Sequence, residues 1–183
     1  MYKNDKAVYV NPSDGEHDAV IIGWEDRGIS QTTYDGKTRE VHQAVIKYEI
    51  LDETLPEDES FGAGNRLVLW DWVNIAFSKN AKLTERRVAI LGLNPEDSEA
   101  RNRFDERETL GVRMILYVKK NENGNAKVLD NRRHEDQDYG PLENQLTITS
   151  SDGTVTTVKS SQDPQTPADE KHPDSTGEDN LPF

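Results

Sequence analysis

Cysteine is absent from the 183 residues of the chain. Without thiols the protein has no disulfide framework, no thiolate metal site and no thiol nucleophile. Long apolar runs are missing as well: no stretch approaches the roughly 18 apolar residues that a membrane span needs, and the N-terminal segment lacks the apolar core of a signal peptide. We therefore expect a cytoplasmic protein that does not enter membranes.

The apolar content is low, because hydrophobic residues make up 33% of the chain and aromatic residues 7%. These fractions are too small for a chain of this length to be packed throughout. The shortage is concentrated after Ser150, where Ser, Thr, Pro and acidic residues dominate and no aromatic residue occurs before Phe183. We therefore predict a folded domain over residues 1–140 and an acidic, disordered tail over residues 141–183.

Five segments are predicted as short strands, because β-branched and aromatic residues recur in them, often alternating with polar ones. Asp35-Gly36 predicts a tight turn between the first and second strands, and Asn123-Gly124 predicts another between the fourth and fifth. The second strand shows a clear alternation of apolar and polar residues, which is typical of an antiparallel sheet with one wet face. The five segments span residues 18–30, 41–51, 66–77, 111–120 and 126–133.

The segment between the third and fourth strands is predicted to be helical. A first helix should begin near Ser78 and end before Gly92, and a second, short one should begin with Asn94 as its N-cap and Pro95 in its first turn. The fold class is therefore mainly β (α+β). We expect a five-stranded Greek-key barrel of the oligonucleotide-binding (OB) type, with one or two helices between strands 3 and 4. An open sheet covered by one helix layer fits almost as well.

Two motifs that suggest chemistry have simpler interpretations. Gly36-Lys37-Thr38 is not a phosphate-binding loop, because Gln31 stands where that loop needs a glycine and the segment falls in a hairpin turn. The stretch HEDQD, residues 134–138, combines an imidazole with three carboxylates, but nothing in it defines a metal geometry, so we interpret it as a solvated charge run. No catalytic constellation emerges, and we expect neither an enzyme nor a cofactor.

The third strand carries two tryptophans on one face. Leu67, Leu69 and Val73 alternate with Trp70 and Trp72, so the two indoles should project from the same side. Two interpretations stay open at this point. The indoles fill a second side of the core or lie under the helix, or they form a platform on which unpaired bases stack.

The fourth strand adds basic and aromatic side chains on one face, which is the combination that a groove for single-stranded nucleic acid requires. By contrast, the arginines of the helical segment stand among many glutamates and are expected on a solvated face: Arg86, Arg87, Arg101, Arg103 and Arg107. The candidate DNA-binding residues are Trp70, Trp72, Arg66, Lys47, Arg113, Tyr117, Lys119, Arg132 and Arg133.

The formal net charge of −13 argues against a nucleic-acid ligand, because phosphate binding usually requires a basic surface. The acidic residues, however, crowd into segments predicted as loops or helix starts, such as DETLPEDES, PEDSE and HEDQD, while several basic residues lie on predicted strands. A net acidic protein of this kind can hold a local basic groove. Its binding should be weak and strongly dependent on salt.

The chain ends in EDNLPF, an apolar tip next to acidic residues on a long polar tether. This ending resembles the C-terminal tip of bacterial and phage single-stranded DNA-binding proteins, which docks into a basic, hydrophobic pocket on replication and repair partners. The resemblance implies that Leu181, Pro182 and Phe183 are the anchors and that Glu178 and Asp179 are the charged flank. Asn180 departs from the family, which usually has an acid there.

The layout of the body is similar to small phage-encoded domains thought to be divergent single-stranded DNA binders. The similarity lies in the order of GEHDAVI, GNRLVLWDWV and ETLGVRMILYV along the chain. It implies a sequence-independent single-stranded DNA-binding protein that acts in phage DNA replication, recombination and repair in the host bacterial cytoplasm, recruits partner proteins through its tip, and could form a homo-oligomer. An acidic DNA mimic that inhibits a DNA-binding enzyme and a protein-only adaptor are the alternatives.

Overall fold

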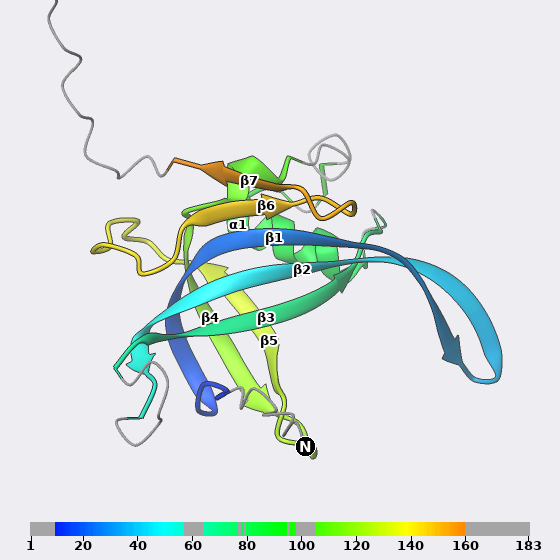
Figure 1. The fold of residues 1–183 in the computed structure, drawn as a ribbon, viewed down its shortest axis with the longest axis horizontal. Helices are drawn as coiled ribbons and strands as arrows, with labels where there is room; N and C mark the ends of the chain where they lie inside the picture. Colours follow the sequence, from blue (N-terminus) through cyan, green and yellow to red (C-terminus); the bar gives the residue numbers. More distant parts are fainter. Residues whose placement is uncertain are drawn as a thin grey trace, which may run out of the picture.

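The computed structural model describes residues 10–56, 64–76, 78, 80–94, 96–97 and 105–159 (Figure 1). These residues form a mainly β fold, as predicted, and all five predicted strands are present. The elements, in chain order, are β1 (Gly15–Tyr34), β2 (Lys37–Thr54), β3 (Arg66–Asn74), helix α1 (Lys82–Leu91), the 3₁₀ helix η1 (Glu106–Thr109), β4 (Arg113–Lys120), β5 (Ala126–Arg133), β6 (Leu146–Thr149) and β7 (Val155–Val158).

The strands form one sheet in the order β3-β2-β1-β4-β5, and neighbouring strands along this path are antiparallel. β1 and β2 are long and strongly curved, and their far ends project from the body as a two-stranded ribbon (Figure 1). Within the described residues β3 and β5 do not pair, so the sheet is open and the predicted barrel is not closed. Helix α1 contacts both of these strands.

The turn between β1 and β2 is the one that the sequence predicts. Asp35 and Gly36 both have positive φ angles, 51° and 69°, and Tyr34 pairs with Lys37 directly across the turn. Two successive residues with positive φ give a type I′ turn, whose twist matches that of the paired strands. Glycine and aspartate tolerate this backbone conformation better than most residues, which explains why the pair stands here.

The ordered body extends further than predicted, because β6 and β7 form a hairpin in residues assigned to the tail. β6 also pairs in parallel with β1 at Gly23 and the two following residues. A Cβ at Gly23 would lie 3.2 Å from the carbonyl oxygen of Thr147, so glycine permits this close approach. The low apolar content misled the prediction, since a short edge hairpin needs few buried side chains; Leu146 is its one fully buried residue. The part of the tail beyond residue 159 lies outside the described residues.

Helix α1 begins at Lys82, four residues later than predicted, and ends as predicted. Gly92 follows it with a φ of 65° and a ψ of 33°, the left-handed conformation that closes many helices. Leu83 and Ile90 point into the core, where they meet the inward face of β3. No helix in the described part of the chain has the length and apolar character needed to cross a membrane. The helix predicted to start at Asn94 lies mostly outside the described residues.

Arg86 corrects the prediction of a solvated arginine face. Arg86 and Arg87 are buried, with 4% and 3% of their surface exposed, whereas Arg107 is exposed as predicted. Arg101 and Arg103 lie outside the described residues. Arg86 faces the sheet, where the buried carboxylate of Asp71 accepts its charge.

The guanidinium of Arg86 connects both open edges of the sheet. Its Nε donates to Asp71 Oδ2 on β3 at 2.8 Å, while Nη1 donates to Asn131 Oδ1 at 3.0 Å and Nη2 to the carbonyl oxygen of Val128 at 2.7 Å, both on β5. Lys82 pairs with the second carboxylate oxygen of Asp71 from a position that is 42% exposed. This buried set of hydrogen bonds takes the place of strand pairing between β3 and β5.

Replacing Arg86 with Met should therefore destabilise the fold strongly. The substitution leaves the buried Asp71 carboxylate without its main partner, and breaking a buried pair in this way costs about 3–5 kcal/mol. Lys82→Met removes the exposed partner of the same carboxylate and should cost less than about 1 kcal/mol. Urea denaturation of both variants measures the difference; equal costs would show that Arg86 is not the principal connection.

Candidate nucleic-acid interface

The two tryptophans of β3 lie on the outer face of the sheet. Leu69 and Val73 face the core and are almost completely buried, while Trp72 on the opposite face is 46% exposed and Trp70 is half-buried. The alternation seen in the sequence is confirmed. Of the two interpretations that it left open, filling of the core does not describe Trp72, because nearly half of this side chain is in contact with solvent.

Two cationic side chains lie over the indole rings. Nζ of Lys47, which is the cross-strand partner of Trp70 on β2, is 4.9 Å from the centroid of the Trp70 ring. Cζ of Arg27 on β1 lies 5.5 Å from the Trp70 centroid and 5.3 Å from that of Trp72. Both separations fall in the range of cation–π attraction. The face therefore combines aromatic rings with positive charge.

Arg27 was missing from the candidates of the sequence analysis. β1 contains a β-bulge between Asp26 and Gly28: these residues pair with consecutive residues of β2, and Arg27 has no partner there. Gly28 has a φ of 69°, and its N–H donates to Asp26 Oδ1 at 2.8 Å. The Asp-x-Gly spacing inside a strand was the available signal, since it combines a local side-chain turn with a glycine suited to a bulge.

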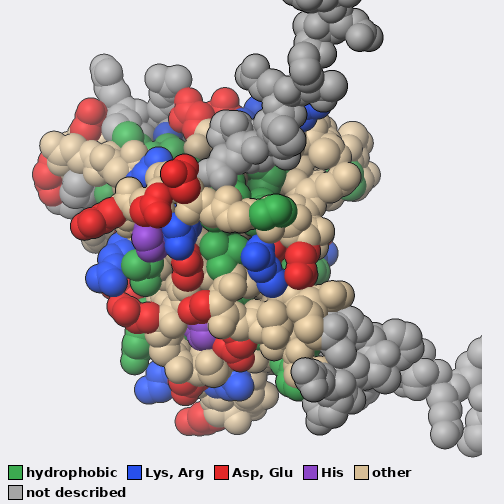
Figure 2. Space-filling model, turned by 90° about the vertical axis from the view of Figure 1, so that its left-hand side faces the viewer, with side chains coloured by type: hydrophobic (Ala, Val, Ile, Leu, Met, Phe, Trp, Pro, Cys, Tyr) green, Lys and Arg blue, Asp and Glu red, His purple; other side chains and the backbone are tan. Residues whose placement is uncertain are grey.

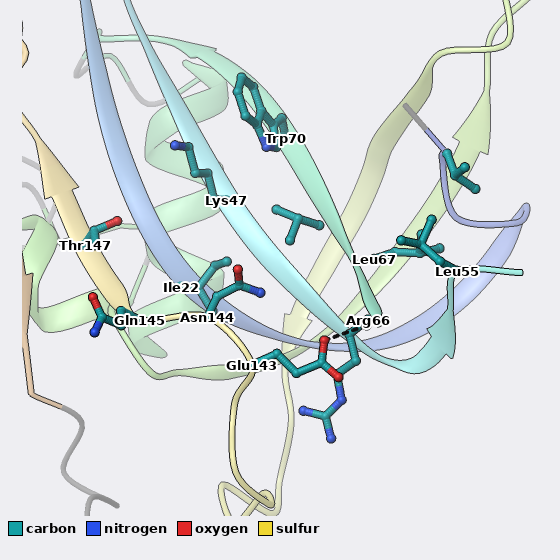
Figure 3. Close-up of a pocket in the computed structure, with 12 residues that line it drawn as sticks. Ile22, Lys47, Leu55, Arg66, Leu67, Trp70, Glu143, Asn144, Gln145 and Thr147 are labelled. Carbon is teal, nitrogen blue, oxygen red and sulfur yellow. Dashed lines mark hydrogen bonds between the residues drawn. The ribbon is translucent and has the colours of Figure 1, made fainter. Parts of the chain in front are cut away.

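Two grooves border Trp70 (Figure 3). The first has a volume of about 640 Å³, and Lys47 and Trp70 extend into it from neighbouring strands while Asn144 and Thr147 approach from the other side. The second has a volume of about 690 Å³; its lining includes Trp70, Trp72, Lys82, Asn121, Asn125 and Lys127. Because Trp70 lines both, the two grooves adjoin at this residue, the second lying between β3 and the turn that joins β4 to β5.

Arg66, a candidate phosphate contact, is instead part of the wall of the first groove. Its Nη1 donates to Glu49 Oε1 at 2.9 Å, and its backbone N–H donates to Glu143 Oε2 at 2.7 Å. Glu49 is completely buried and also accepts bonds from the backbone N–H of Glu143 at 3.0 Å and from Asn144 Nδ2 at 2.9 Å. Arg66 and Glu49 together hold the segment before β6 against β2.

The charge of Glu49 depends on these hydrogen bonds. Burial alone would raise the pKa of this carboxyl group, but the bonds from Asn144, Glu143 and Arg66 stabilise the carboxylate more strongly, so its pKa lies below the ordinary value of 4.5.

The candidate residues of β4 and β5 are mostly engaged elsewhere. Arg113 forms a bidentate pair with Asp18, with Nε–Oδ1 at 2.9 Å and Nη2–Oδ2 at 2.6 Å, and this hydrogen bonding raises the pKa of Arg113 above its usual value. Arg132 pairs with Glu16 at 3.4 Å, and Arg133 Nη1 donates to the last turn of α1 at 2.7 Å. Arg113 neutralises a carboxylate and Arg133 caps a helix, whereas Arg132 forms only a weak, exposed pair that lies away from the tryptophans.

Tyr117 is 46% exposed, but it lines neither groove. Its cross-strand neighbours are Glu16 on β1 and Asp130 on β5, so acidic side chains flank it on both sides. Lys119 stands opposite Lys127, which lines the second groove. On the face of the molecule shown in Figure 2, acidic and basic side chains of the described residues are interspersed, and the basic ones do not form a continuous patch.

The structure thus divides the predicted set. Lys47, Trp70 and Trp72 lie close together, and Arg66 forms part of the wall of the first groove. Arg27, which was not among the predicted residues, joins the two tryptophans. The predicted residues of β4 lie on a different part of the surface. The predicted partner-binding tip, Glu178, Asp179, Leu181, Pro182 and Phe183, lies outside the described residues.

Comparison with protein-family models, with curated proteins and with solved structures finds no match to this chain. Within the described ranges, no three His, Asp or Glu side chains come together in a way that could hold a metal ion.

The buried Glu49 carboxylate predicts a specific dependence of stability on pH. Because its pKa is lowered on folding, its stabilising contribution is complete above about pH 4.5 and is lost as the pH falls below that value. Glu49→Gln should be less stable than the wild type by about 1–3 kcal/mol at pH 7. The difference in the free energy of unfolding between the wild type and Glu49→Gln should be smaller at pH 3.5, as measured by urea titrations of both proteins at the two pH values. A gap that is the same at both pH values would mean that ionisation of Glu49 does not contribute.

Proposed function

We propose that the protein binds single-stranded DNA without sequence preference on the outer face of β2 and β3. The observation that carries this proposal is the pair of solvent-facing indoles, Trp70 and Trp72, with Lys47 and Arg27 beside them. Rings accept unpaired bases whatever their identity, and cations attract the phosphates between them. Few other ligands need both along an open groove.

The strand order supports this proposal. A meander of three strands, a helix, and a hairpin whose first strand returns to β1 is compatible with a divergent OB barrel that stays open between β3 and β5. OB folds are partly open five-stranded barrels, and they bind oligonucleotides on the face of strands 2 and 3 and on the loops flanking it. The tryptophans stand on that face, and the turn between β4 and β5 borders the second groove.

The distribution of charge supports weak, salt-sensitive binding. Lys127 adds a cation to the groove beyond Trp72, where Lys82 is already paired with Asp71, although the whole chain carries −13. Repulsion by the rest of the molecule opposes the local attraction, and added salt screens both. The same net charge favours a second candidate, an acidic DNA mimic, which would bind no oligonucleotide at all.

We also propose that the tail gives the protein its place in phage DNA replication, recombination and repair. The tip EDNLPF carries an apolar anchor and an acidic flank on a polar tether, which is the form of a linear docking peptide. A strand-coating body and a recruiting tip make one functional unit, because the tether raises the local concentration of partners at exposed DNA. The host bacterial cytoplasm is the corresponding location.

Trp72→Ala tests the interface directly. Loss of one stacking ring should weaken binding of oligo-dT by roughly 1–3 kcal/mol and reduce the quenching of tryptophan fluorescence on binding. Tyr117→Ala is the matched control, because Tyr117 is equally exposed but lies outside the grooves; its effect should stay within about 0.5 kcal/mol.

These titrations are made with labelled oligo-dT and with duplex DNA of the same length, at two salt concentrations. Preference for the single strand, weakening with salt, is the expected result for the wild type. Absence of oligonucleotide binding by the wild type would contradict the proposal and favour the DNA mimic. A larger effect of Tyr117→Ala than of Trp72→Ala would move the interface to β4.

Deletion of residues 178–183 tests the role of the tail. The deletion removes two acids and the apolar anchor, so capture of replication and repair proteins from host extract should fail. Affinity for oligo-dT should stay level or rise modestly, most visibly at low salt, because an acidic tail competes with phosphates for basic side chains. Lost DNA binding with retained capture would show that these residues belong to the DNA-binding unit.

A further inference from the structure

We propose that Arg27 and Lys47 form a phosphate-binding site beside the tryptophans, and that Glu25 occupies this site as an internal anion that a DNA phosphate must displace. This inference rests on the proposed single-stranded DNA binding, and it assigns to Glu25 the control of its strength. Neither Glu25 nor Arg27 belonged to the residues singled out in the sequence.

Glu25 contacts both cations at once. Its Oε1 lies 3.1 Å from Arg27 Nη1, and its Oε2 lies 2.7 Å from Lys47 Nζ. The side chain is only 16% exposed, whereas those of Arg27 and Lys47 are 36% and 23% exposed. Because the three groups are partly withdrawn from water, their attraction is screened less than that of a fully exposed pair. The carboxylate presents two anionic oxygens to two cations, as a bridging phosphate group would.

The same contacts place cations on the surfaces that bases would use. Arg27 lies over the rings of Trp70 and Trp72, and Lys47 lies over Trp70. Glu25 holds Arg27 of its own strand β1 and Lys47 of the neighbouring strand β2, so it stabilises an arrangement in which the rings are partly covered. A base that stacks on either indole must first displace the cation that lies over the ring. A DNA phosphate that pairs with this cation replaces the ion pair that the cation loses with Glu25.

The bulge in β1 makes this exchange structurally feasible. Arg27 is the bulged residue, without a cross-strand partner on β2, so its backbone is not fixed by pairing to β2 and can adjust when the side chain moves. Glu25, by contrast, is paired with Val45 on β2 and with Thr149 on β6. The backbone of Glu25 is therefore paired with a strand on each side, whereas the backbone of Arg27 lies in the bulge.

The charge balance predicts the direction of the effect. Two cations and one carboxylate leave a net charge of +1 at the site, and removal of the carboxylate charge raises it to +2. Binding of single-stranded DNA should then become tighter and more dependent on salt, because each further cation that pairs with a phosphate steepens the slope of log K against log[salt] by about 0.7.

Glu25→Gln is the test, with Glu16→Gln as the matched control. Both substitutions remove one negative charge from a glutamate paired with an arginine, but the Glu16–Arg132 pair is about two-thirds exposed and lies beside Tyr117, away from the grooves. Oligo-dT titrations at four salt concentrations should show tighter binding by Glu25→Gln, on the order of fivefold at low salt, with the slope increased by about 0.7. Glu16→Gln should keep the wild-type slope.

Arg27→Gln provides a second, independent variant. It removes one of the two proposed phosphate contacts, so the slope should fall by about 0.7 and the affinity should drop. Thermal unfolding of each variant identifies any loss of folding. If Glu25 instead positions the cations for DNA, Glu25→Gln will bind more weakly than the wild type, and the inference fails while the proposed function stands.

The inference is also overturned if Glu25→Gln keeps the wild-type slope of log K against log[salt], or if Glu16→Gln steepens this slope as much as Glu25→Gln does. Either result leaves the proposed function intact. If neither the wild type nor Glu25→Gln binds oligo-dT, both the function and the inference are wrong. Binding by Glu25→Gln alone would contradict the proposed function of the wild type, and it would show that the carboxylate suppresses binding at this site.

Discussion

The fold depends on one buried guanidinium. β3 and β5 are the two ends of the main strand order, and within the described residues they do not pair with each other. Arg86 connects them by donating to Asp71 on one side and to Val128 and Asn131 on the other. A buried arginine is stable only when its donors are satisfied and its charge is compensated, and here the two edges of the sheet supply both. The ion pair to Asp71 and the hydrogen bonds to β5 thus connect two strands that do not pair with each other.

This connection also determines where the tryptophans stand. Asp71 lies between Trp70 and Trp72 on β3, and it faces inward because Arg86 and Lys82 hold its carboxylate. The neighbouring indoles then face outward, as the pleat of the strand requires. Burial and the nearby Asp71 charge raise the pKa of Tyr48, so this phenol stays neutral beside the ion pair. The buried ion pair of Asp71 and the outward-facing indoles of Trp70 and Trp72 therefore lie on opposite faces of the same strand, β3.

Glu49 performs a comparable role on β2. Its buried carboxylate receives hydrogen bonds from Arg66, Glu143 and Asn144, and these bonds hold the wall of the first groove in place. An acidic protein can therefore contain a local cluster of cations, because part of its negative charge is used inside the structure. The formal net charge of −13 describes the whole chain, and it says little about the potential at the groove.

Much of the fold was accessible from the sequence because its signals are local. The Asp35-Gly36 turn, the left-handed Gly92 after α1 and the alternation that turns Leu69 inward and Trp72 outward each depend on neighbouring residues alone. The β6–β7 hairpin was missed because its partner, β1 at Gly23, lies more than a hundred residues away along the chain. Composition describes what a segment contains, and it does not identify the strand edge that the segment meets.

The candidate site shows the same division. The sequence by itself determined that two indoles share a face and that Lys47 belongs to a strand with one wet side, since a period of two follows from backbone geometry. Only the tertiary structure decided which cations reach those indoles. Arg113 and Lys47 have the same charge and similar strand positions, and each is paired with a carboxylate, Asp18 and Glu25 respectively, yet only Lys47 lies over an indole, that of Trp70. The partner of a long charged side chain is set by contacts between distant strands, because its charge pairs with whatever opposite group the fold brings within a few ångströms.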